Sequence, residues 1–236
     1  MGEWWSYGVS DLLMFSSRTW YRMLELHNRA WWPLQPVAMV MGIGLLWAIN
    51  RRVRVALRMG LWMLGLSMLF VAWEFHWKRY AIINLAAPWF ALAFAIEGLL
   101  LTALGALRRD LTLSQVNAAV RTGLVLLSIA VLLYPVSLLM WFKPMEQSEW
   151  FGLAPDPTVM ATLGLLLCLC GSEGVRRPRL TWTLLSAIPL AWCLVTGATL
   201  WALDASDWRL MPSVGVLAGV VGWWQSGLAK PSPSAG

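Results

Sequence analysis

The sequence predicts an all-α, polytopic transmembrane helical bundle of about seven spans, preceded by an amphipathic interfacial N-terminal helix. Hydrophobic residues make up 59% of the 236 positions, and charged residues make up only 13%. Several apolar runs approach or exceed the ~20 residues that cross a hydrocarbon core of about 30 Å. About seven such runs would occupy most of the chain, so we expect short loops and no separate soluble domain.

Residues 1–33 are expected to form an extracytoplasmic interfacial segment rather than a span. Charged residues recur too often there: Asp11, Arg18, Arg22, Glu25 and Arg29. From Thr19 onward apolar residues return at helical spacing, with His27 on the same face. The charged residues from 22 to 29 lie opposite, three and four positions apart, where ion pairs form. An amphipathic helix with tryptophan on its apolar face is typical of a membrane interface. Packing over the ends of the bundle is a compatible alternative.

The bundle is expected to occupy residues 34–227. Its apolar segments cover about 34–49, 56–73, 88–107, 118–142, 157–172, 180–203 and 210–225. Residues 228–236, rich in proline and serine, are expected to form a disordered cytoplasmic tail.

The basic residues predict the orientation of the bundle. Loops after the first, third and fifth segments hold Arg51, Arg52, Arg54, Arg58, Arg108, Arg109, Arg121, Arg176, Arg177 and Arg179. The opposite side holds most of the acids: Glu74, Glu146, Glu149, Asp156, Asp204 and Asp207. By the positive-inside rule the N-terminus lies outside and the C-terminus lies in the cytoplasm. This distribution accounts for the net charge of +6, so we expect the lipid bilayer, and no nucleic acid, as a partner.

The stretch from Trp73 to Tyr80 combines ionisable and aromatic side chains between two apolar segments. His76 in this stretch and His27 each follow a glutamate by two positions, Glu74 and Glu25, on the predicted outer side. Imidazole binds metals and titrates near neutral pH, which makes the two histidines candidate metal ligands or proton-responsive groups. Residues two apart point to different faces of a helix, which weakens the case for a shared site.

An interfacial anchor is the alternative for the same stretch. Lys78 and Arg79 would then extend toward the head groups, and Glu74 would pair with Lys78 one helical turn away. Both interpretations place the stretch at the outer end of the second span.

Glu97 is the one carboxylate well inside a predicted span. Burying it costs roughly 2.5–3.5 kcal/mol on insertion scales, so it should face the bundle interior or a wet cavity. It is either a proton or cation site, or a protonated glutamate bonded to a neighbouring hydroxyl. The second alternative gains if the third span begins at Ala81 rather than Pro88, because Glu97 then moves toward the cytoplasmic third.

Several chemistries are disfavoured. No P-loop, Rossmann glycine turn or zinc-protease helix is present, which favours a protein that is not an enzyme. The three cysteines lie in apolar runs without a Cys-x-x-Cys motif, which indicates packing: Cys168, Cys170 and Cys193. Retinal, which requires a lysine in the middle of the last span, is excluded by the positions of Lys78, Lys143 and Lys230. A haem held by two histidines would need both inside facing helices, and neither is predicted there. The cofactor is otherwise unknown.

Several motifs resemble a family of uncharacterised multi-pass bacterial inner-membrane proteins, defined only as a domain of unknown function. The matching positions are Glu3-Trp4-Trp5, Ser10-Asp11, Phe15-Ser16, Arg22 with Glu25, Trp32-Pro33-x-Gln35, His76-Trp77-x-Arg79-Tyr80-Ala81-x-x-Asn84, residues 151–158 (FGLAPDPT) and residues 196–201 (TGATLW). The resemblance implies a bacterial inner membrane with a periplasmic outer side, and nothing about a substrate.

These observations support three functions. The first is a small transporter or channel-like protein for an ion or small polar solute, with Glu97 as the intramembrane site. Its outer vestibule would be built from Glu25, His27, Glu74, His76, Arg79 and Asp156. The second is a non-catalytic accessory or anchoring subunit of a larger membrane complex, or a homo-oligomer. It is suggested by small residues four apart, as in Gly215-x-x-x-Gly219, which allow close helix contact. The third is a metal- or haem-binding membrane protein using the two histidines.

Overall fold

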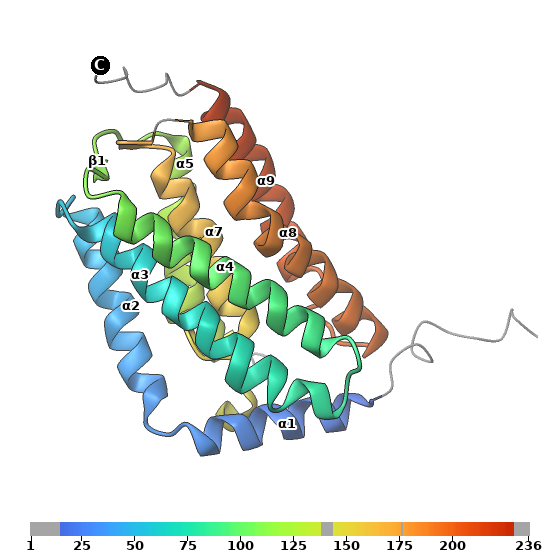
Figure 1. Ribbon diagram of the computed structural model, residues 1–236. Coiled ribbons are helices and arrows are strands. Elements are labelled where there is room, and N and C mark those ends of the chain that lie inside the picture. The colour runs from blue at the N-terminus through green and yellow to red at the C-terminus, as the bar shows by residue number, and fades with distance from the viewer. Residues whose placement is uncertain (1–14, 138–143, 176, 229–236) are drawn as a thin grey trace, which may run out of the picture.

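The computed structural model describes residues 15–137, 144–175 and 177–228 (Figure 1). Its long helices are α1 (Ser17–Ala30), α2 (Leu34–Asn50), α3 (Ala56–Phe70), α4 (Ala87–Leu107), α5 (Ala118–Ser128), α7 (Pro155–Leu169), α8 (Pro178–Ala202) and α9 (Leu210–Leu228). The short elements are the π-helical segments η3 (Val71–Trp77) and η5 (Ile129–Leu133), the 3-10 turns η4 (Tyr80–Ile82) and η7 (Met145–Gln147), helix α6 (Tyr134–Ser137), and strands β1 (Thr112–Leu113) and β2 (Ser172–Glu173). The all-α class predicted from the sequence is confirmed.

The structure supports fewer spans than the seven predicted. Within the described residues, four helical stretches are long and apolar enough to cross a membrane: Ala56–Ile82, Ala87–Leu107, Ala118–Val136 and Pro178–Ala202. A fifth is obtained if α1 and α2, which meet at an angle of 84°, count as one broken span. Helix α7 is too short, because its 15 residues rise only about 22 Å. The predicted fourth span runs past residue 137 into positions outside the described residues.

Helix α7 is the centre of the bundle rather than one of its walls. Every one of its 15 residues is buried, and it packs against α3, α5, α8 and α9 (Figure 1). The crossing with α5 is close because two glycines face each other. A Cβ atom on Gly164 would lie 2.7 Å from the carbonyl oxygen of Gly123, and one on Gly123 would press on the carbonyl oxygen of Gly164. The apolar sequence of α7 is therefore explained by contact with protein.

The predicted basic loops gather at one end of the bundle. Strands β1 and β2 pair antiparallel, with Thr112 opposite Glu173, and so join the loop after α4 to the loop before α8. Arg58 Nε donates to the carbonyl oxygen of Gly105 at 2.9 Å, which places the start of α3 beside the end of α4. The Arg179 guanidinium lies 4.0 Å from the Trp223 ring centroid, near the end of α9. Arg176 is outside the described residues.

Helix α1 lies across the opposite end of the bundle (Figure 1). The Ser16 side chain caps it by accepting a hydrogen bond from the backbone N–H of Thr19 at 3.3 Å. Its buried face includes Trp20, Met23, Leu24, His27 and Asn28. On the outer face, Glu25 forms the expected ion pairs with Arg22 at 2.8 Å and with Arg29 at 2.7 Å. The helix therefore packs over the ends of the bundle, as one of the two compatible interpretations expected.

Candidate functional site

The most highly connected polar side chain is Asp156, in the first turn of α7. It is 2% exposed. Its Oδ1 accepts hydrogen bonds from Trp192 Nε1 and Thr196 Oγ1, both at 2.7 Å, and its Oδ2 accepts one from the Tyr134 hydroxyl at 3.0 Å. Trp192 and Thr196 are one turn apart on α8, so both side chains reach the same oxygen. Three donors and a helix N-terminus together stabilise a carboxylate at this position.

A second buried carboxyl lies against Asp156. Glu149 Oε2 accepts a hydrogen bond from the backbone N–H of Asp156 at 3.2 Å. Burial first, and then the charge of Asp156, raise the pKa of Glu149 well above its ordinary value. Burial also raises the pKa of Asp156, to about 6, although its three side-chain hydrogen bonds oppose this shift. Two neighbouring buried carboxyls with raised pKa values are a pair that can hold and exchange a proton.

A polar groove lies at the α1 end of the bundle. The groove has a volume of about 780 Å³ and is walled by α1, η7 and the turn after α8. Tyr21 of α1 lines it. Burial first, and then the charges of Asp207 and Glu149, raise the pKa of Tyr21 to about 12. The Glu149 charge therefore acts on a side chain of the groove wall.

The π-helical segment η3 turns His76 into the bundle. Widening the helix here places two consecutive side chains, Phe75 and His76, inside the protein, and both are 0% exposed. The His76 ring is enclosed by aromatic rings, with centroid distances of 4.5 Å to Phe94, 5.0 Å to Trp192 and 6.1 Å to Phe90. Neither ring nitrogen has a hydrogen-bond partner among the described residues. Trp192 therefore touches His76 with its ring while its N–H is bonded to Asp156.

Glu97 lies three residues beyond Phe94 on the same face of α4. It is 0% exposed, and neither of its carboxyl oxygens has a partner among the described residues. A bonded hydroxyl, the alternative considered from the sequence, is thus not found there. The nearby Thr102 hydroxyl donates instead to the carbonyl oxygen of Gly98, at 2.7 Å.

His27 is held by hydrogen bonding and by aromatic packing. Its Nε2 lies 3.0 Å from the carbonyl oxygen of Leu153, and its ring centroid lies 5.4 Å from that of Phe75. Burial first, and then the charge of Arg79, lower the pKa of His27 to about 4, while the bond to Leu153 opposes this shift. The Phe75 ring also lies 5.4 Å from His76, so it packs against both imidazoles.

The structure brings some of the predicted site residues together and leaves others outside. His76 and Asp156 are linked through Trp192, and Glu25, which forms ion pairs with Arg22 and Arg29, lines the polar groove. Glu74 pairs with Lys78 at 2.6 Å, as the anchor interpretation predicted. In the described parts of the chain, no group of three or more His, Cys, Asp or Glu residues could hold a metal ion. Within those parts, neither His27 nor His76 belongs to such a group.

Glu149, Tyr134 and Trp192 were not among the predicted site residues. The only sequence signal for this contact lies in two of the motifs that carry the family resemblance, residues 151–158 and 196–201. They meet in space, because Thr196 donates to Asp156. Within the first motif, the Gly152 N–H donates to the Thr158 hydroxyl at 3.0 Å, and that hydroxyl donates to the carbonyl oxygen of Ala154 at 2.6 Å.

The comparisons with known proteins identify a family but no activity. No curated protein and no solved structure matches this chain. The sequence profile of a family of unknown function, DUF6064, matches residues 17–230, which include every described residue discussed in this site. The chain therefore belongs to the DUF6064 family, as its resemblance to an uncharacterised family predicted.

Proposed function

We propose that this protein is an integral protein of the bacterial inner membrane that moves protons or a small cation across the bilayer. The observation that carries the proposal is Glu97. Its carboxyl is fully buried without a partner among the described residues, in a helix apolar enough to span. An ionisable group kept in the apolar interior at a cost, and without a structural bond, is available for a transported ion.

A series of contacts, two of them made by the aromatic rings of Trp192 and Phe94, supports a path from the groove to Glu97. The groove wall at Tyr21 is within electrostatic reach of Glu149, and Glu149 is bonded to Asp156. Trp192 connects Asp156 to the ring of His76. Phe94 touches His76 and precedes Glu97 by one turn of α4.

The close packing along this path favours a proton or a small cation, rather than a larger solute, as the transported species. Aromatic rings enclose His76, and each residue of α7 is buried. A proton can pass between donors and acceptors through small displacements of side chains and water, whereas a larger solute would require the helices to separate.

The two ends of the bundle support an orientation. The arginine-rich loops lie at the end that holds β1 and β2, and α1 lies across the end that holds Glu149 and Asp156. By the positive-inside rule the arginine-rich end faces the cytoplasm. In this orientation α1 is an extracytoplasmic interfacial helix, the groove opens to the periplasm, and the C-terminus is cytoplasmic.

Flux in proteoliposomes tests the proposal. With an imposed pH gradient and an internal pH-sensitive dye, we expect Glu97→Gln to reduce proton flux at least tenfold, a loss typical of a removed transport carboxyl. Glu74→Gln, which alters an exposed ion pair, is the matched control and should leave flux unchanged. Wild-type flux in both Glu97→Gln and His76→Ala would overturn the proposal. Replacing the pH gradient with a Na⁺ or K⁺ gradient distinguishes the cargoes.

A second function, that of an accessory subunit, is favoured by helix α2. Only four of its residues are buried: Gln35, Gly42, Leu45 and Ile49. Its other side exposes large apolar side chains around Gly44, where an added Cβ would meet nothing within 4 Å. The Gly215-x-x-x-Gly219 motif gives no such support, because Gly215 packs against Cys193 of α8 within the chain. Stoichiometric partners after purification in mild detergent would support this function, and a monodisperse lone protein would argue against it.

A further inference from the structure

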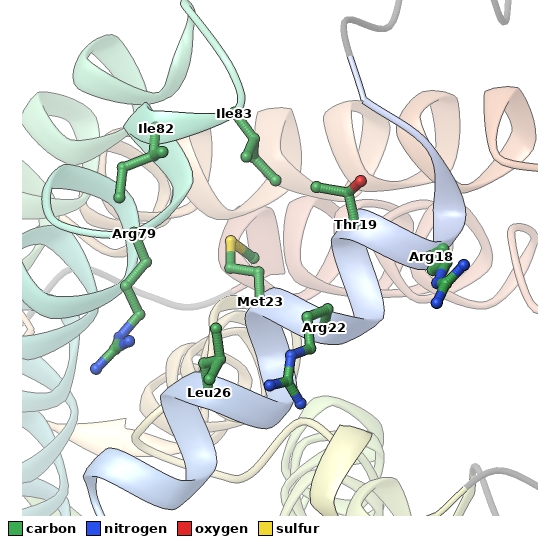
Figure 2. A pocket seen from close by; sticks show the side chains of 8 residues that line it. All are labelled: Arg18, Thr19, Arg22, Met23, Leu26, Arg79, Ile82 and Ile83. Atoms are coloured by element: carbon green, nitrogen blue, oxygen red, sulfur yellow. The ribbon is translucent and has the colours of Figure 1, made fainter.

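A cavity of about 370 Å³ separates α1 from the turn that follows η3 (Figure 2). Three arginines line it, Arg18 and Arg22 from α1 and Arg79 from the opposite wall. Apolar side chains form the rest of the wall: Met23, Leu26, Ile82 and Ile83. None of the described residues that line the cavity is acidic. The cavity therefore combines strong positive charge with an apolar surface, and it borders the polar groove, with which it shares Arg18 and Arg22.

The arginines are only partly neutralised by the protein. Arg22 shares Glu25 with Arg29. Among the described residues, neither Arg18 nor Arg79 forms a salt bridge, and the buried Nε of Arg79 has no hydrogen-bond partner. An unpaired, buried guanidinium donor is costly, and an oxyanion would satisfy it with charge-assisted hydrogen bonds.

The apolar part of the wall matches an anion that carries an acyl chain better than a free inorganic anion. Ile82 is 80% exposed and Leu26 is 45% exposed, and both lie beside the arginines. Phosphate alone would leave these side chains uncovered, whereas an attached acyl chain would cover them. The cavity is also at the end of the apolar stretch Ala56–Ile82, at the depth where head groups meet the hydrocarbon core.

We propose that this cavity binds an anionic phospholipid. Its phosphate accepts hydrogen bonds from Arg79, while Arg22 and Arg18 add positive charge along the α1 wall, and its acyl chain lies along Leu26 and Ile82 (Figure 2). The bound lipid holds α1 against the end of the α3–η3 helix. The site requires no transported ion, although it shares Arg18 and Arg22 with the polar groove.

Lipid-dependent thermal stability tests this site. The purified protein is titrated in detergent with phosphatidylglycerol or phosphatidylcholine, and the melting temperature is followed. We expect phosphatidylglycerol alone to raise the melting temperature. In Arg79→Gln its half-saturating concentration should rise about tenfold, the loss of one charge-assisted hydrogen bond, and in Arg18→Gln it should rise by a smaller factor because only positive charge is lost. Arg54→Gln, an exposed arginine at the other end of the bundle, is the matched control and should behave as wild type.

Three results would overturn the proposal. The first is an unchanged phosphatidylglycerol midpoint in both Arg79→Gln and Arg18→Gln. The second is equal stabilisation by phosphatidylcholine, which would indicate that the head-group charge is not recognised. The third is equal stabilisation by inorganic phosphate, which would indicate an anion site without a lipid tail. Because Arg18 is exposed on α1, Arg18→Gln gives a folded variant even if Arg79→Gln disturbs the turn.

Discussion

The buried ionisable groups Glu149, Asp156, His76 and Glu97 are here called the polar line. Asp156 and Glu97 are both buried carboxyls of this line, yet their surroundings differ completely. Asp156 accepts three side-chain hydrogen bonds, from Tyr134, Trp192 and Thr196. Glu97, which is at least as deeply buried, accepts none from the described residues. The histidines repeat the contrast, because His27 is bonded to Leu153 whereas both nitrogens of His76 lack a described partner.

The contrast separates buried groups that stabilise the fold through hydrogen bonds from buried groups that make no such bonds and reduce its stability. A satisfied buried carboxylate stabilises its neighbours, and removing it leaves donors without acceptors. An unsatisfied carboxyl reduces stability, so folding alone does not explain why it is there. Each of the following variants tests whether one of these groups stabilises the fold.

The largest effect is expected for Asp156→Ala. The substitution leaves the hydroxyl of Thr196 and the indole N–H of Trp192 buried without their acceptor. At about 1–3 kcal/mol for each unsatisfied donor, partly relieved by water, we expect the free energy of unfolding to fall by about 4 kcal/mol. Chemical denaturation in detergent micelles measures this change.

Asp110→Ala is the control for Asp156→Ala. Asp110 is an aspartate at the arginine-rich end whose side chain is 63% exposed, and it should change stability by no more than about 0.5 kcal/mol. Equal losses in the two variants would show that the Asp156 hydrogen bonds do not support the bundle.

The next effect is a loss of stability on acidification caused by His27. Its pKa is about 4 in the folded protein and about 6.5 when unfolded. The unfolded chain therefore binds a proton below pH 6.5 that the folded protein refuses, so stability falls as the pH is lowered from 6.5 toward 4. The difference of about 2.5 pKa units amounts to about 3 kcal/mol at pH 4.

His27→Gln isolates this contribution, because a glutamine amide can still donate to Leu153 but does not titrate. We expect its stability to fall less between pH 7 and pH 4 than that of wild type. Glu149 acts in the opposite direction, since its raised pKa favours the folded protein at low pH. The comparison of His27→Gln with wild type removes this contribution, because Glu149 is present in both. Parallel pH profiles would contradict the assignment.

Glu97→Leu should change stability in the opposite direction from Asp156→Ala. Replacing an unpartnered buried carboxyl with an apolar side chain of similar size removes a desolvation cost, and we expect a gain of about 2 kcal/mol. The same variant should lose flux. A more stable variant without flux would show that Glu97, unlike Asp156, serves transport rather than stability. A destabilised variant would indicate that Glu97 has a structural partner.

The sequence predicted the local contacts of this fold but not the long-range ones. The ion pairs of Glu25 and Glu74 follow from helical spacing, and both are present. The bonds from Asp156 to Trp192 and Thr196 join residues 36 and 40 positions apart, and no local pattern encodes them. The central position of α7 was also missed, because a helix that is apolar on every side suits lipid and protein surroundings equally well.

The smallest effect is expected for Glu74→Gln, which tests the outer boundary of the polar line. Glu74 shares η3 with His76, and its side chain, which is 12% exposed, pairs with Lys78, whose side chain is 49% exposed. A pair one helical turn apart with one exposed partner contributes about 0.5 kcal/mol, so the melting temperature should change little. Added salt should erase the remaining difference from wild type, because ions screen an exposed pair. A loss that persists at high salt would mean that Glu74 belongs with the buried groups, and that the polar line extends to the surface through η3 rather than through the groove beside Tyr21.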